Sequence, residues 1–485
     1  MTPVKFHYSQ SIISSLRQNG HILQLLTAVI CISFPLPALA SSLPVRELNL
    51  WWCIPFAGTL LSIAMCPMLL PNIWHKHSGK IIGLWCSLFL LPLSWRYGIS
   101  TGISLTLHAL IEEYIPFILL LLSLYTLSGG IVIQNNNIGS VRLNISLLAT
   151  GTLLAGLMGT TGAAMLLIRP LLRANAHRHH CTHVVVFFIF LVANIGGGLT
   201  PLGDPPLFLG FLKGIGFQWT LSHMLIPVLV NTLVLLLVFF CIDSYLWKHE
   251  PKATSVAQQT TASLTIQGKA NLVLLLAVTC VILFSGICKT APVWHVYGIE
   301  ISLLAWLRDG LLLIITLCGL KLTPEKLRRQ NDFNWAPMQE VSKLFIGIFI
   351  TIAPVMAILQ LGTSGDFQVL VQLIQHNGEP VNALYFWMSG LLSGFLDNAP
   401  TYLVFFNLAG GDAEILMQYF PKTLLAISMG SVFMGALSYI GNAPNLMIKA
   451  IAEQQRVIMP SFFGYMGWSV TLLIPLFVLD TLLFF

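Results

Sequence analysis

The sequence predicts an all-α, multi-pass membrane protein built from two inverted-topology repeats, and three observations predict it. Of the 485 residues, 56% are hydrophobic and only 9% are charged, whereas a soluble domain carries roughly 25% charged residues. Long apolar runs are spread along the whole chain, and in a bilayer they must form helices because each backbone has to satisfy its own hydrogen bonds. Two distant apolar regions are also interrupted by Gly, Pro and small polar residues in the same order.

The N-terminus has the pattern of a secretory signal. Lys5 and Arg17 precede the apolar stretch 22–34, and the sequence Ala38-Leu39-Ala40 then provides a typical cleavage site. We therefore predict a signal-like segment at residues 1–40, with an uncleaved first helix as the alternative. Cleavage after Ala40 would leave the mature N-terminus outside the cell membrane.

Ten apolar segments are predicted to span the membrane, with bounds at 50–71, 80–97, 105–133, 184–211, 219–247, 271–288, 298–321, 338–361, 422–452 and 461–485. Two further apolar stretches, 145–172 and 382–410, contain a break in the middle and are predicted to be re-entrant hairpins. The long polar stretch 248–270 is predicted to be a flexible cytoplasmic linker. It separates a first repeat at 50–247 from a second, inverted repeat at 271–485.

The basic residues test this arrangement. With the N-terminus outside, the clusters of Lys and Arg at 76–80, 173–178, 248–269, 321–343 and 449–456 all fall on the cytoplasmic side, as the positive-inside rule requires. The rule holds only if both broken segments are hairpins that enter from opposite sides. The prediction is a bacterial inner-membrane protein with a periplasmic C-terminus. In such a protein, the net charge of +6 does not indicate a nucleic-acid partner.

The two interrupted regions match each other by position. Thr160 and Thr161 lie 237 residues before Asp397 and Asn398, and the spacing is 238 for three further pairs, Gly203 and Gly441, Asp204 and Asn442, and Pro206 and Pro444. In transporters built from repeats, paired interruptions of this kind form the substrate site. The alternative is a pair of ordinary kinks, because Gly and Pro are common in membrane helices.

A helix that is interrupted within the membrane frees backbone groups that can replace the hydration shell of a small ion. Glycines permit unusual φ angles in such a break, and prolines stop the helix. The predicted backbone residues of the site are Gly196, Gly197, Gly198, Gly203 and Gly441. The predicted side-chain ligands are Asp397, Asn398, Asp204, Thr160, Thr161, Asn194, Thr200, Thr401, Asn442 and Asn445.

The two acids in these breaks are the candidate proton and cation carriers. A carboxylate inside a membrane is costly and usually functional, and an exchanger needs one carboxylate that binds either a proton or a cation. Asp397 ranks first, because Asn398 beside it can supply a carbonyl oxygen. Asp204 is either a second carrier or a structural cap for the half-helix that begins at Pro205.

Other charged residues leave alternatives open. Glu112 and Glu113 point about 100° apart on a helix, so that at most one faces the site, or both lie near the outer interface. Lys449 either extends to the cytoplasm or neutralises a site carboxylate, and Arg308 and Asp309 either pair internally or line the contact between the halves. The His-rich stretch 176–183 lacks the spacing of a closed zinc site, and no metal centre or cofactor is predicted.

At the motifs Asn194–Pro206, DNAPT (397–401) and GNAPN (441–445) the chain resembles the ion transporter superfamily of NhaD-type sodium/proton antiporters, arsenite permeases and citrate/dicarboxylate transporters. It is most similar to the CitMHS-like branch, over most of residues 50–485. The resemblance implies a homodimer formed through a scaffold domain, and a transport domain that moves as an elevator with both hairpin tips at the site. One departure is the first tip, where Thr160-Thr161 replaces the acid–amide pair often found in the antiporters.

The predicted function is exchange of Na⁺ or Li⁺ for H⁺ by a secondary transporter. The alternative is a Na⁺-coupled citrate or dicarboxylate transporter, which is disfavoured because two fixed acids at the site would repel a carboxylate. An intramembrane enzyme would need a nucleophile and base or a metal set that converge, and the sequence offers neither.

Overall fold

The computed structural model describes residues 47–134, 139–250, 265–288, 292–296, 299–376 and 379–485. The predicted signal-like segment and most of the predicted linker, residues 251–264, lie outside the described residues. The described part is almost entirely helical, which confirms the all-α fold class. The strands that are present form three short antiparallel pairs, β1–β2, β3–β4 and β5–β6.

The first half of the chain contains nine α-helices interrupted by short 3₁₀ or π turns. Their bounds are η2 (Leu50–Cys53), α2 (Ile54–Leu69), α3 (Pro71–Tyr97), α4 (Ile99–His108), η3 (Ala109–Tyr114), α5 (Ile115–Ser128), α6 (Val141–Met158), α7 (Thr160–Ala174), α8 (Thr182–Leu191), η4 (Ile195–Leu199), α9 (Pro205–Leu212) and α10 (Phe217–His249). The strand β1 (Val132–Gln134) lies between α5 and α6. The number of α-helices refers to the residues of this half that the structure describes.

The second half follows a similar order. Its helices and turns are α11 (Lys269–Ile287), α12 (Leu303–Leu322), α13 (Glu325–Gln330), α14 (Ala336–Thr351), α15 (Ala353–Gln360), η5 (Gly362–Ser364), α16 (Gln368–Leu373), α17 (Asn382–Phe395), α18 (Asn398–Leu408), α19 (Ala413–Gln418), α20 (Pro421–Phe433), η6 (Met434–Leu437), α21 (Ala443–Gln454) and α22 (Phe462–Phe484). Its strands are β2 (Thr265–Gln267), β3 (Val293–Val296), β4 (Ile299–Ser302), β5 (Gln375–His376) and β6 (Glu379–Pro380).

Within the described residues, ten helices are long and apolar enough to cross a membrane, which confirms a multi-pass membrane protein. Nine of them coincide with predicted spans. The tenth is α6, which the sequence analysis assigned to the first hairpin. The predicted span 422–452 is instead divided into α20, η6 and α21, and only its first part, Pro421–Leu437, forms a short apolar helical segment.

Both predicted hairpins are present, and local sequence explains where each helix ends. Gly159 has a φ of 81°, a conformation that glycine adopts at no steric cost, and this ends α6 before α7 begins at Thr160. In the second hairpin, Asp397 is the N-cap of α18, and its carboxylate accepts a hydrogen bond from the Ala399 N–H at 3.0 Å. We call Gly159–Thr161 the first tip and Leu396–Asn398 the second tip.

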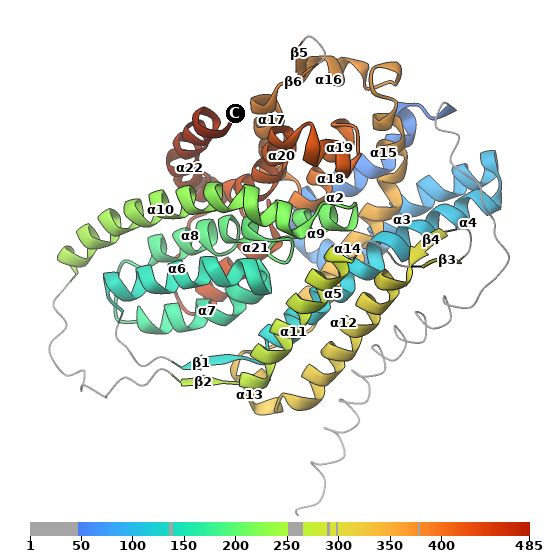
Figure 1. Ribbon diagram of the computed structural model, residues 1–485. Coiled ribbons are helices and arrows are strands. Elements are labelled where there is room, and N and C mark those ends of the chain that lie inside the picture. The colour runs from blue at the N-terminus through green and yellow to red at the C-terminus, as the bar shows by residue number, and fades with distance from the viewer. Residues whose placement is uncertain (1–46, 135–138, 251–264, 289–291, 297–298, 377–378) are drawn as a thin grey trace, which may run out of the picture.

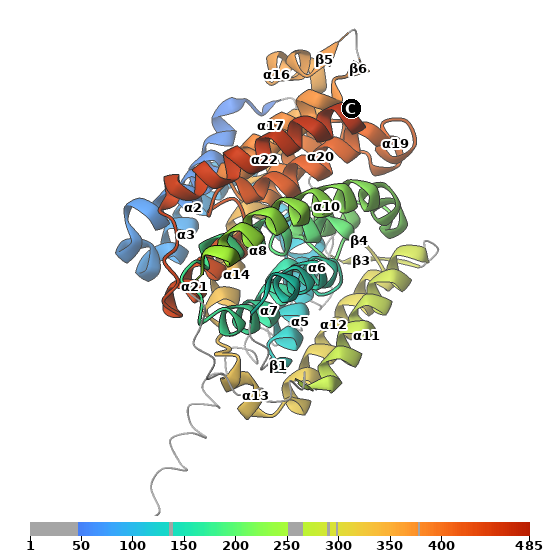
Figure 2. The ribbon, with the colours of Figure 1, turned by 90° about the vertical axis from the view of Figure 1, so that its left-hand side faces the viewer.

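The helices form two groups that pack side by side (Figures 1 and 2). The bundle group, in which helices contact one another directly, consists of α2–α5, α11, α12, α14 and α15. The hairpin group consists of the two hairpins α6–α7 and α17–α18 together with α8–α10 and α20–α22. The groups meet mainly where α5 contacts α7 and α9, and where α15 contacts α18.

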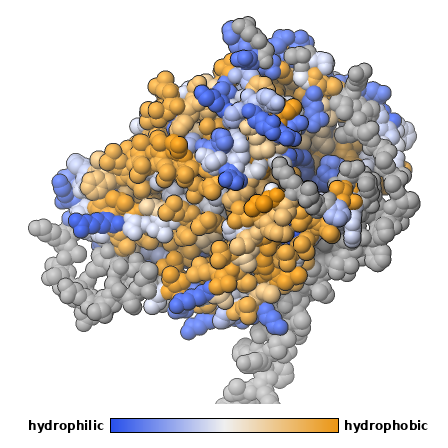
Figure 3. Space-filling view, viewed as in Figure 1, coloured by the Kyte–Doolittle hydropathy of each residue, from blue (hydrophilic) through white to orange (hydrophobic). Residues whose placement is uncertain are grey.

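Burial distinguishes the centre of the hairpin group from its periphery. In the segment Thr182–Leu199, which contains α8, 89% of the residues are buried, against 28% in an apolar 18-residue stretch of α10. The exposed side of α10 carries leucines such as Leu233 and Leu237, each 65% exposed. Apolar side chains cover much of the face shown in Figure 3, as expected for a surface that contacts lipid. The interrupted helix that follows α8 therefore lies deep inside the molecule.

Equivalent contacts hold the break in each half. The Thr200 hydroxyl donates to the Gly156 carbonyl at 2.5 Å, and 238 residues later the Ser438 hydroxyl donates to the Gly394 carbonyl at 2.5 Å. A Cβ on Gly203 would lie 2.3 Å from the Gly197 carbonyl oxygen, and one on Gly441 would lie 2.6 Å from that of Gly435. Only glycine permits so close an approach of two backbones, which explains the matching interruptions at the 238-residue spacing.

Candidate functional site

Both hairpin tips converge on one carboxylate, that of Asp204, which is 2% exposed. Thr160, in the first tip, donates its hydroxyl to Asp204 Oδ1 at 3.0 Å. Asn398, in the second tip, donates its Nδ2–H to Asp204 Oδ2. Asn442, from the break in the second half, donates to Asp204 Oδ1 at 3.2 Å. Segments that are far apart in the sequence thus supply three neutral donors to a single acid.

This geometry changes the predicted roles of the two acids. The alternative that Asp204 caps the half-helix α9 is wrong, because its side chain makes no capping hydrogen bond although it stands at the N-cap position. Asp397, which ranked first as the carrier, provides the cap of α18 instead. Asp397 is half-buried, whereas Asp204 is enclosed. The difference follows from tertiary contacts, since Asp204 and Asn398 are 194 residues apart.

A cavity of about 100 Å³ opens beside these residues. Its polar lining comes from the two tips and the two breaks and comprises Thr160, Thr161, Asp204, Asp397, Asn398 and Asn442. Its apolar lining comes from both groups, with Phe117 on α5 and Phe345 on α14 in the bundle group and Phe208 on α9 and Met447 on α21 in the hairpin group. Among the described residues that line the cavity, none is Lys, Arg or His.

One polar atom at this site has no partner. The Oδ1 atom of Asn398 is buried and accepts no hydrogen bond from the described residues, while Asn398 as a whole is 1% exposed. A buried carbonyl oxygen without a donor costs about 1–3 kcal/mol. Because Asn398 lines the cavity, this oxygen is available to a cation in it. The site therefore offers a carboxylate, an amide oxygen and threonine hydroxyls, which are the hard oxygen donors that alkali cations prefer.

Four predicted ligands make other contacts and do not line the cavity. Thr200 bonds Gly156, and the Thr401 hydroxyl donates to the Asp397 carbonyl at 3.0 Å. Asn194 donates its Nδ2–H to Asn445 Oδ1 at 2.9 Å, and this pair joins the two broken helices. The expectation that Gly196, Gly197, Gly198, Gly203 and Gly441 adopt unusual φ angles is wrong, because none of them has a positive φ. These glycines serve close packing instead.

The charged residues whose roles the sequence left open are paired away from the cavity. Glu113 forms an ion pair with Lys213, at the end of α9, and Glu112 pairs with His108 at 3.1 Å. Neither glutamate lines the cavity. Lys449 pairs with Glu453 at 2.8 Å, so the alternative that it neutralises a site carboxylate is wrong. Arg308 and Asp309 form the predicted internal pair at 2.8 Å.

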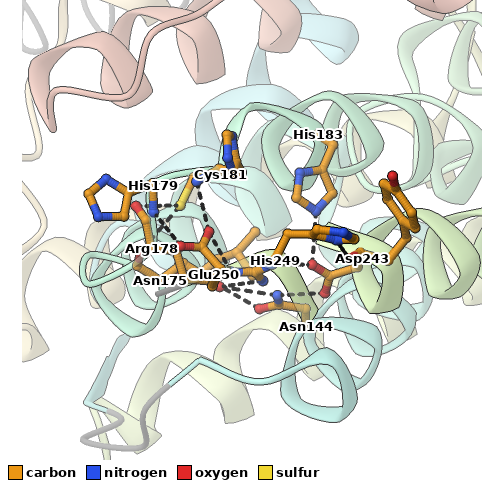
Figure 4. A network of polar contacts seen from close by, with 12 residues as sticks. Asn144, Asn175, Arg178, His179, Cys181, His183, Asp243, His249 and Glu250 are labelled. Atoms are coloured by element: carbon orange, nitrogen blue, oxygen red, sulfur yellow. Dashed lines mark hydrogen bonds and ion pairs between the residues drawn. The ribbon is translucent and has the colours of Figure 1, made fainter. Parts of the chain in front are cut away.

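A second buried polar cluster escaped the sequence analysis (Figure 4). We call it the base network, because it closes the base of the first hairpin; its members are Asn144, Asn175, Arg178, His183, Asp243 and Glu250. Asp243 accepts hydrogen bonds from Arg178 at 2.6 Å, from His183 at 2.9 Å and from Asn144 at 3.1 Å. The Arg178 and Asp243 side chains are fully buried. The network ties α6, α8 and α10 to the loop that follows α7.

At the edge of the base network, Glu250 anchors the backbone of the His-rich loop. Burial alone would raise the pKa of Glu250, but N–H groups of His180 and His179, at 2.9 and 3.1 Å, together with the Arg178 charge, hold it below its usual value. The sequence analysis only placed the basic residues of this loop on the cytoplasmic side and found no zinc-site spacing in it. An acid such as Asp243 near the end of a long apolar run was the available signal, because such residues are rare and usually paired.

Comparison with known proteins agrees with this architecture. No protein with curated annotation matches the sequence. A family model described as "Putative citrate transport" matches residues 45–485, which include both hairpins, both breaks and every residue of the cavity. The match, together with the ten helices of the described residues that are long and apolar enough to cross a membrane, shows that this chain is a multi-pass membrane protein and belongs to the family of that description.

Proposed function

We propose that this protein is a secondary active transporter that exchanges Na⁺ or Li⁺ for H⁺, with Asp204 binding either ion in turn. The observation that carries the proposal is the enclosed Asp204 carboxylate, which neutral donors surround on the tips of both hairpins. No ion pair links it to a basic residue within the described part of the chain. A carboxylate without a fixed countercharge can be neutralised by a cation or by a proton, but not by both at once.

The cavity fits a small cation better than a carboxylate substrate. Pockets for organic ligands are roughly 300–1,000 Å³, whereas this one is about 100 Å³. Citrate would also face Asp204 and Asp397 without a basic residue among the described lining side chains. The observation that favours Na⁺-coupled citrate transport, the alternative, is the description of the family itself.

The proposal includes an elevator movement of the hairpin group against the bundle group. The cavity lies at the boundary between the two groups, and its carboxylate and amide groups all come from the hairpin group. A rigid displacement of the hairpin group would therefore carry Asp204 and both tips together. We also propose a bacterial inner-membrane location with a periplasmic C-terminus, and a homodimer formed through the bundle group. The location and orientation rest on the distribution of Lys and Arg, and the dimer rests on the family resemblance.

Liposomes test the proposed function directly. The purified protein is reconstituted with a pre-formed pH gradient and an internal pH dye, and Na⁺, Li⁺, K⁺ and citrate are added separately. Collapse of the gradient on addition of Na⁺ or Li⁺ alone is the expected result. Uptake of labelled citrate that requires Na⁺, without a response to Na⁺ alone, would establish the alternative function instead.

Replacement of Asn398 by alanine tests its amide oxygen as a cation ligand. We expect the Na⁺ concentration for half-maximal exchange to rise about tenfold, or about 1.4 kcal/mol, with a smaller change in the maximal rate. The matched control is Asn407→Ala, because Asn407 is buried on the same helix α18 but bonds the Leu403 carbonyl, away from the cavity. Equal apparent affinities for Na⁺ in the wild type and Asn398→Ala would exclude a coordinating role.

Cross-linking tests the movement of the two groups. Glu113, in η3 of the bundle group, pairs with Lys213, at the end of α9 in the hairpin group, so a bifunctional thiol reagent on Glu113→Cys/Lys213→Cys should stop exchange. The matched control is Ser123→Cys/Thr316→Cys, whose parent hydroxyls lie 2.7 Å apart within the bundle group. Both pairs are made in a cysteine-free background. Full exchange after cross-linking of the first pair would show that exchange does not require the hairpin group to move against the bundle group.

A further inference from the structure

A second carboxylate without a charged partner lies between α10 and α22, outside the cavity described above. Asp480, on α22, is fully buried, and so is Asn231, near the middle of α10. The Nδ2 atom of Asn231 lies 2.9 and 3.0 Å from the two carboxylate oxygens. The same Nδ2 group also donates to the Pro227 carbonyl at 2.9 Å. One amide group thus provides all the hydrogen-bond donation that Asp480 receives from the described residues.

The surroundings of Asp480 provide no positive charge. On α10 its neighbour is Asn231, and α17 contributes Trp387, whose indole N–H donates to Thr481, the next residue, at 3.0 Å. Neither side chain is titratable, and within the described chain Asp480 takes part in no ion pair. An isolated ionised carboxylate in a medium of low dielectric constant is far more costly than a neutral acid.

The hydrogen-bonding groups themselves favour a neutral acid. An ionised carboxylate can only accept hydrogen bonds, whereas a protonated one also has an O–H that must donate. The Oδ1 atom of Asn231 is buried and has no donor in the described structure. When the Asp480 carboxyl turns so that one oxygen faces Asn231 Oδ1, an acid O–H there gives that oxygen a donor, while the Asn231 N–H continues to serve the other carboxyl oxygen. Protonation of Asp480 therefore provides a hydrogen-bond donor for Asn231 Oδ1, whereas ionisation of Asp480 leaves that oxygen without one.

The first half of the chain supplies an internal comparison. Asp243 lies 237 residues before Asp480, the spacing that relates the two hairpin tips, and it stands near the end of α10 as Asp480 stands near the end of α22. Asp243 contacts Arg178 at 2.6 Å and His183 at 2.9 Å (Figure 4). The same position therefore holds an acid with a buried countercharge in one half and an acid with only an amide in the other.

We infer that Asp480 and Asn231 form a proton-binding site, in which Asp480 is a neutral carboxylic acid that forms a two-way hydrogen-bonded pair with the Asn231 amide. This site is separate from Asp204, and the inference does not depend on the proposed exchange of Na⁺ and H⁺. It adds a second proton-binding group inside the hairpin group, with H⁺ rather than a metal cation as its ligand.

Infrared spectroscopy of the purified protein at neutral pH tests this inference. The difference spectrum between the wild type and Asp480→Asn should contain the carbonyl band of a protonated carboxylic acid, and the band should not change on addition of Na⁺. The matched control is Asp243→Asn, because a carboxylate paired with Arg178 contributes no such band. Absence of the band from the Asp480→Asn difference spectrum, or its loss on addition of Na⁺, would overturn the inference.

A second variant covers failure of Asp480→Asn to fold. In Asn231→Leu, a neutral Asp480 keeps an apolar environment but loses its amide partner, so its carbonyl band should persist and move to higher frequency. An ionised Asp480 would contribute no acid band in the wild type, so no wild-type acid band would shift in Asn231→Leu. That outcome would also overturn the inference.

Discussion

Replacement of Asp204 by asparagine is expected to reduce Na⁺-dependent proton exchange to the level of protein-free liposomes. Asparagine cannot exchange a proton for a cation, because its amide does not ionise near neutral pH. The fold should survive the change. The introduced amide would present N–H groups to Asn398, and rotation of the Asn398 amide would turn its unpartnered Oδ1 towards them. The measurement is the collapse of a pH gradient on addition of Na⁺, together with size-exclusion chromatography.

The matched control for this prediction is the same change at Asp397. Asparagine is as good an N-cap as aspartate, so α18 should keep its first turn in Asp397→Asn. Because Asp397 is half-buried and caps α18, whereas Asp204 is buried and receives hydrogen bonds from both tips, we expect measurable exchange to remain in Asp397→Asn. Exchange that survives in Asp204→Asn but is lost in Asp397→Asn would reverse the assignment and restore Asp397 as the carrier.

Replacement of Arg178 by glutamine is expected to destabilise the protein by about 3–5 kcal/mol, because it leaves Asp243 with an uncompensated buried charge. The Arg178–Asp243 contact is 2.6 Å and both side chains are fully buried. The loss of stability in Arg178→Gln should appear as a lower apparent unfolding temperature in detergent. It should be partly reversed in the double variant Arg178→Gln/Asp243→Asn, which removes both charges.

An exposed ion pair provides the control for Arg178. Arg329 also lies 2.6 Å from its acid, Glu325, but both side chains are about three-quarters exposed. Exposed pairs contribute little because solvent screens them, so Arg329→Gln should leave the unfolding temperature almost unchanged. Similar losses in Arg178→Gln and Arg329→Gln would show that burial of the base network has no energetic importance.

Much of the fold was predictable because the bilayer restricts what a long apolar segment can do. A run of about 20 apolar residues must be a helix, and clusters of Gly, Pro and Asn inside such a run can only interrupt it. The two tips and the two breaks were therefore visible at Thr160, Asp397, Gly203 and Gly441. Their matching spacing follows from the backbone contact that Gly203 makes with Gly197 and Gly441 makes with Gly435.

The different surroundings of Asp204 and Asp397 were not predictable, because they depend on contacts between distant segments. Asp204 directly precedes a proline and Asp397 lies three residues before one, both in an apolar context, and local sequence suggests a cap or a carrier for either. The structure distinguishes them through Asn398 and Asn442, which reach Asp204 from the other half of the chain. For the same reason the partners of Asp243, 60 to 99 residues away, could not be identified from spacing alone.

The single enclosed carboxylate between the two tips has an electrical consequence. If Asp204 crosses the membrane carrying Na⁺ in one direction and H⁺ in the other, the loaded site is neutral on both journeys. A membrane potential performs work of about 2.3 kcal/mol per 100 mV only on a net charge that moves through it. One-for-one exchange at Asp204 would then be driven by the concentration gradients of the two ions alone and would proceed equally well across an unpolarised membrane.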